Sequence, residues 1–171
     1  DMARTLDHIS NGRFIFAIGS GWNERDYTEY GYELGTAASR LRDLDRDMPV
    51  IMERFKTLNP PPIRQPFPVM IGGGGEKVTL RIVAQHANIW NGQGEPEVLA
   101  HKNQVLDDWC VKVGRNPDEI ERSAQIFGPQ LDKLDEYYAA GITHFIADAG
   151  GPDYDLAPLH KLIAWRDSKQ G

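Results

Sequence analysis

The segment from Pro68 to Lys77 constrains the fold most, because a short apolar run, Val-Met-Ile, passes through four consecutive glycines into a helical pattern. Such a run predicts a buried strand, a turn and then a helix. Glycines adopt positive φ and expose bare amides, so an anion can approach the backbone of Gly72, Gly73, Gly74 and Gly75 closely. The start of the following helix adds unpaired N–H groups and partial positive charge, with Lys77 or Thr79 as candidate side chains for the anion.

A tight turn between strand and helix with surplus glycines is the structural alternative. It leaves the four-residue run unexplained, because each glycine costs up to about 1 kcal/mol of backbone entropy relative to alanine. The segment contains neither a G-x-G-x-x-G fingerprint nor a glycine followed by Lys and Ser or Thr. NAD and ATP are therefore poor candidates for the anionic ligand.

Apolar runs and amphipathic stretches alternate along the rest of the chain. Strands are expected at 13–18, 69–71, 87–90, 121–127 and 142–146. The intervening helices are expected at 36–55, 76–86, 96–113, 130–140 and 156–165. This alternation predicts an α/β fold with a parallel sheet and right-handed crossovers, in a single domain over residues 1–171. Five such units suit either a small doubly wound sheet or just over half of an eight-unit barrel of ~250 residues.

Charge and composition exclude several classes of function. The net charge of −6 argues against a general nucleic-acid surface. The single cysteine, Cys110, excludes an internal disulfide and a cysteine-based zinc site, and favours a cytoplasmic protein. The five histidines lack ligand spacing, so no metal site is expected. No apolar run is long enough to span a bilayer, and no membrane partner is expected.

Two blocks of sequence resemble those of luciferase-like monooxygenases. The first is Leu6-Asp-His-Ile-Ser-Asn-Gly-Arg-Phe-Ile-Phe-Ala-Ile-Gly-Ser-Gly-Trp-Asn-Glu24, similar to the L-D-x-x-S-x-G-R-F block that ends in G-W-N-E. The second is Ile71-Gly-Gly-Gly-Gly-Glu-Lys-x-Thr-Leu-Arg81 with Ala87-Asn-Ile-Trp-Asn91, and it resembles the deazaflavin-dependent branch, which uses coenzyme F420. The motifs cover roughly the first half of the chain, and the general resemblance extends to Asp167.

The resemblance implies a (β/α)8 TIM-barrel fold, of which this chain supplies strands four to eight. Strands one to three are then absent, so we expect a fragment or truncated product with two exposed sheet edges. The glycine run would bind the cofactor phosphate. The turn after the preceding strand would lie beside the ring system with Ser20, Gly21 and Asn23. Where sugar-phosphate dehydrogenases of the family carry a catalytic glutamate, this chain has Trp22, and the nearest carboxylate is Glu24.

Two functions from different classes follow from the resemblance. The first is an oxidoreductase that transfers hydride between coenzyme F420 and a small organic substrate, with FMN as the alternative cofactor and molecular oxygen as its co-reactant. The second is a non-catalytic cofactor-binding remnant or half-barrel module, completed by a second copy or by another chain. The residues identify neither the substrate nor a catalytic acid or base.

Overall fold

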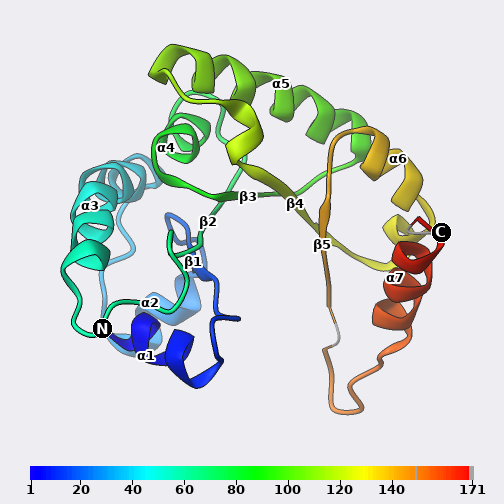
Figure 1. Ribbon diagram of the computed structural model, residues 1–171, viewed down its shortest axis with the longest axis horizontal. Coiled ribbons are helices and arrows are strands. Elements are labelled where there is room, and N and C mark those ends of the chain that lie inside the picture. The colour runs from blue at the N-terminus through cyan, green and yellow to red at the C-terminus, as the bar shows by residue number, and fades with distance from the viewer. Residues whose placement is uncertain (149, 170–171) are drawn as a thin grey trace.

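The computed structural model describes residues 1–148 and 150–169 and contains one parallel sheet of five strands in the order β1-β2-β3-β4-β5 (Figure 1). Each strand therefore lies beside its neighbour in sequence, which is the order of a barrel rather than of a doubly wound sheet. The strands are β1 (Phe16–Ile18), β2 (Val69–Gly72), β3 (Ile89–Gly92), β4 (Glu121–Ile126) and β5 (His144–Ala147). The predicted α/β architecture and the number of strands are thus found.

Helices cover the convex side of the curved sheet, and the other side faces the open centre of the molecule (Figure 1). Two helices, α1 and α2, flank β1, and the longer helices α3 to α5 follow. The helical elements are α1 (Met2–Ile9), α2 (Glu24–Tyr30), α3 (Ala37–Thr57), α4 (Thr79–His86), α5 (Pro96–Val113), η1 (Pro117–Glu119), η2 (Gly128–Asp132), α6 (Leu134–Ala139) and α7 (Ala157–Ser168). None of these described helices is both long and apolar enough to cross a membrane.

The strand register sorts side chains onto two chemically different faces. Pairing of Ile71 with Trp90 places both on the helix-covered face, where each is fully buried in the main core. Pairing of Asn91 with Ser123 places both on the opposite, concave face. Because successive residues of a strand point to opposite faces, the apolar run of each strand alternates between the core and the centre. Of this polar pair, Asn91 is half-buried and within reach of a ligand, whereas Ser123 is fully buried.

Three local predictions were wrong. The first strand is shorter than 13–18, and within it Ala17 is exposed while its neighbours are half-buried. Its position explains this, because within the described residues β1 pairs only with β2, just as β5 pairs only with β4. The helix expected at 76–86 begins only at Thr79, after a turn. The helix expected at 130–140 is divided into η2 and α6, because Lys133 leaves helical geometry at φ −110° and ψ 22°.

Candidate functional site

The glycine run forms a loop from the carboxyl end of β2 to the first turn of α4. Gly73 has φ of +124°, a conformation that side chains rarely allow, and its N–H donates to the Asn91 carbonyl at 3.1 Å. The following backbone N–H groups, those of residues 74–78, have no acceptor within the described part of the chain. Unpaired peptide donors before a helix form an anion-binding arrangement. The unpaired donors of this loop are thus backbone N–H groups rather than charged side chains.

Two tryptophans hold the loop from the helix-covered side. The indole N–H of Trp90 donates to the Gly73 carbonyl at 2.8 Å, and that of Trp109 donates to the Glu76 carbonyl at 2.7 Å. Thr79 is buried, and a Cβ added at Gly75 would lie only 2.8 Å from its hydroxyl oxygen. The absence of a side chain at Gly75 therefore allows the loop to pack directly against the buried Thr79.

Glu76 points to α5. Its Oε1 atom lies 2.6 Å from Lys102 Nζ and 3.1 Å from His101 Nε2. The hydrogen bond from Lys102, aided by His101, lowers the pKa of the Glu76 carboxyl below its usual value. The carboxylate is thus ionised and is paired with side chains of α5.

A second glycine-containing loop follows β1 and lies beside the first. Gly21 has φ of +78°, and the Tyr27 hydroxyl occupies the place that a Cβ would need. The Gly21 carbonyl accepts a hydrogen bond from Arg40 Nε at 3.0 Å. Asn23 caps α2, because its side chain accepts from the Arg25 N–H at 3.3 Å. Because β1 and β2 are parallel, the two loops that follow them lie at the same end of the sheet.

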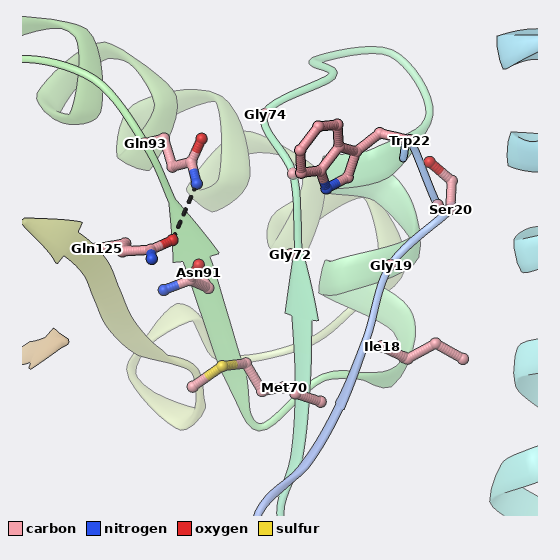
Figure 2. A pocket seen from close by; sticks show the side chains of 13 residues that line it. Ile18, Gly19, Ser20, Trp22, Met70, Gly72, Gly74, Asn91, Gln93 and Gln125 are labelled. Carbon is pink, nitrogen blue, oxygen red and sulfur yellow. Dashed lines mark hydrogen bonds between the residues drawn. The ribbon is translucent and has the colours of Figure 1, made fainter. Parts of the chain in front are cut away.

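The two loops and the ends of β3 and β4 line a pocket of about 970 Å³ that is open to solvent (Figure 2). This volume lies in the range of small-molecule sites, and the carboxyl ends of parallel strands are where α/β proteins place such sites. The pocket is lined by Ala17, Ile18, Gly19, Ser20, Gly21, Trp22, Met70, Gly72, Gly73, Gly74, Asn91, Gln93 and Gln125. Trp22 is 83% exposed and projects at the pocket mouth.

Five of the eight cofactor-binding residues predicted from the sequence line the pocket: Ser20, Gly21, Gly72, Gly73 and Gly74. The other three, Asn23, Gly75 and Thr79, are not among the lining residues. Asn23 and Thr79 instead support the two loops, as a helix cap and as a buried packing residue. Glu24, the nearest carboxylate in sequence, is the first residue of α2 and does not line the pocket either.

No sequence pattern indicates the polar wall that β3 and β4 form on the other side of the pocket. Asn91 Nδ2 donates to Ser123 Oγ at 3.0 Å, and Gln93 Nε2 donates to Gln125 Oε1 at 3.1 Å (Figure 2). The partners in each pair lie on different strands or strand ends, so only the β3–β4 register reveals them. The hydrogen bond from the Trp90 indole to the glycine loop has no local signal in the sequence either. Among the described residues, no group of three or more His, Cys, Asp or Glu side chains is placed to hold a metal ion.

Two solved structures share this fold. The coenzyme F420 dependent tetrahydromethanopterin reductase from Methanopyrus kandleri is similar over 91% of this chain and 74% of its own, with a TM-score of 0.65 and 15% identity. A riboflavin lyase solved with modified FMN and riboflavin is similar over 81% of this chain and 41% of its own, with a TM-score of 0.54 and 15% identity. The expected fold class, part of a luciferase-like (β/α)8 barrel, is confirmed.

Sequence comparison adds relatives and a family. Uncharacterized proteins of Mycobacterium tuberculosis and Mycobacterium bovis are each 24% identical over 164 residues, which cover 87% of this chain and 56% of the relative. The chain thus spans little more than half the length of these curated relatives. Residues 1–160 match the luciferase-like monooxygenase family. The match covers most of the chain, which therefore belongs to the luciferase-like monooxygenase family.

Proposed function

We propose that this chain forms the cofactor-binding part of an oxidoreductase, which transfers hydride between coenzyme F420 and a small organic substrate. The observation that carries the proposal is the row of unpartnered N–H groups at residues 74–78, directly before α4 and beside a pocket of cofactor size. A phosphate seated there would accept hydrogen bonds from the loop backbone and would benefit from the partial positive charge of the helix start.

The residues present fit such a group. Gly72 and Gly74 line the pocket, and a Cβ at Gly72 would meet no atom within 4 Å, so the space before the loop is open to a ligand. Ser20 and Gly21 border the same space from the neighbouring loop, where the ring system would lie. When bound, the deazaflavin supplies the hydride chemistry, and the protein orients it and supplies the surrounding electrostatics. Asn23, Gly75 and Thr79 contribute by maintaining the two loops.

FMN is the alternative cofactor, because its phosphate could use the same loop. Deazaflavin is favoured by the F420-type second sequence block. The fold alone does not distinguish the two cofactors, because it is shared with an F420-dependent reductase and with a riboflavin lyase solved with modified FMN. Titrating the chain separately with F420 and with FMN, followed by fluorescence, distinguishes the two. We expect tighter binding of F420, and tighter binding of FMN would overturn the choice of cofactor.

A matched pair of variants tests the role of the loop in this binding. Gly74→Ala adds a Cβ whose nearest neighbour, Lys102 Cε, is 3.8 Å away, so the fold should be unaffected. Gly74→Asp places a negative charge at the same position and should weaken cofactor binding by about tenfold or more, since like charges within a site repel. Equal affinity of both variants would refute phosphate binding at this loop.

A second function is favoured by one specific observation: among the described residues that line the pocket, none is a carboxylate, histidine, lysine or arginine that could act as an acid or base. In this alternative, the chain is a non-catalytic cofactor-binding module. A second copy or another chain then pairs with β1 and β5, the two strands that each have a single neighbour among the described residues. Analytical ultracentrifugation and an activity assay on the same sample separate the two proposals. Turnover by the monomer would refute the module.

A further inference from the structure

The pocket wall opposite the β1 loop is a pair of side-chain amides at the ends of β3 and β4. Figure 2 shows Gln93 and Gln125 in contact beside Asn91, and the bond from Gln93 Nε2 to Gln125 Oε1 is 3.1 Å. This bond uses one donor and one acceptor. Gln93 Oε1 and Gln125 Nε2 have no partner among residues 1–148 and 150–169. The pair thus presents a free acceptor next to a free donor.

The same wall is uncharged. Charged residues make up 26% of the sequence, yet none of the 13 described residues that line the pocket is Asp, Glu, Lys or Arg. An ionised group of a ligand that moved from water to this wall would lose its hydration and find no counter-ion, which costs desolvation free energy. A neutral group with its own donor and acceptor would instead pair with the two amides at no electrostatic penalty. The lining therefore discriminates by charge as well as by hydrogen bonding.

The pair lies across the pocket from the glycine loops. The glycine loops at the ends of β1 and β2 form one side of the pocket, and the amides at β3 and β4 form the other (Figure 2). Building on the proposed function, we infer that Gln93 and Gln125 select the substrate, and that this substrate carries an uncharged amide-like group, with a carbonyl and an N–H or hydroxyl side by side. The pair acts in specificity, since neither amide can exchange a proton as an acid or base near neutral pH.

Benzamide and benzoate are suitable probes, because they share one shape and differ in charge and in the amide N–H donor. Their binding can be followed through the ¹⁵N–¹H signals of the glutamine side chains, both with and without added cofactor. We expect benzamide to bind about tenfold more tightly than benzoate, since it keeps the second hydrogen bond and avoids burying a charge. Equal binding of the two probes would overturn the inference.

The variant Gln125→Glu removes the free donor and adds a negative charge. It should therefore weaken benzamide binding about tenfold and abolish the shift of the Gln93 side-chain amide signals on binding. Gln85→Glu is the control, because Gln85 is exposed on α4 and bonds to Arg81 rather than to the pocket. An unchanged benzamide affinity in Gln125→Glu would refute the role of the pair. If the protein failed to bind cofactor but still discriminated between benzamide and benzoate, only the proposed function would be refuted. If it bound cofactor but did not discriminate between the two probes, only this inference would be refuted.

Discussion

The indole of Trp90 offers the sharpest test of how the glycine loop is maintained. Trp90 is fully buried, and its N–H donates to the Gly73 carbonyl at 2.8 Å. In Trp90→Phe the lost hydrogen bond costs about 1 kcal/mol. The ring atoms that are removed add about 2 kcal/mol, at ~0.8 kcal/mol for each buried carbon. We therefore expect the free energy of unfolding to fall by about 3 kcal/mol.

Urea denaturation followed by circular dichroism measures this loss, and amide hydrogen exchange locates it. The Gly73 N–H donates to the Asn91 carbonyl at 3.1 Å, so its exchange reports on the loop. Exchange at Gly73 should accelerate in Trp90→Phe by more than the global loss of stability predicts, because the loop loses its anchor. Cofactor affinity should fall in parallel.

Trp165→Phe is the matched control. The Trp165 indole also donates a hydrogen bond, to Asp135 Oδ1 at 2.8 Å, but it lies on α7, away from the loop. This variant should lose stability without a selective change at Gly73. If Trp90→Phe lost stability but kept both Gly73 protection and cofactor affinity, the indole would contribute packing alone, and the proposed anchoring of the loop would be refuted.

Three further predictions concern single residues. Gly73→Ala should cost about 1–3 kcal/mol, because φ is +124° and the new Cβ would lie 3.1 Å from the Thr79 methyl carbon, whereas Gly72→Ala should leave denaturation curves unchanged. Burial lowers the pKa of His86 below its usual 6.5, so the folded state disfavours protonation and stability should fall as pH drops below 6.5. His86→Gln should flatten that part of the pH profile, and His160→Gln, at an exposed position, should not. Burial also raises the pKa of the Cys110 thiol, so its reaction with a thiol reagent should be slow until urea unfolds the chain, and rapid labelling of the native protein would contradict this.

The sequence was most informative where local chemistry decides the structure. Apolar runs located four of the five strands, and the glycine run located the loop, because both depend on neighbouring residues. The exception is β4, whose sequence Glu-Arg-Ser-Ala-Gln-Ile is mostly polar. It was least informative where distant segments decide. The exposure of Ala17 follows from the edge position of β1, and the support of the loop by Trp90 and Trp109 follows from tertiary contacts. The contact of Gln93 with Gln125 spans 32 positions and has no local pattern.

The charges around the loop explain how an acidic protein could bind an anion there. The net charge of −6 is spread over the chain, and such charges are screened beyond about 8–10 Å at physiological salt. The local carboxylate, Glu76, is compensated by Lys102 at 2.6 Å. What remains at the pocket is the backbone itself, whose N–H dipoles are fixed by Trp90, Trp109 and the start of α4. Under the proposed function, anion affinity at this site would depend on loop geometry more than on side-chain charge, so removal of a buried indole should lower it.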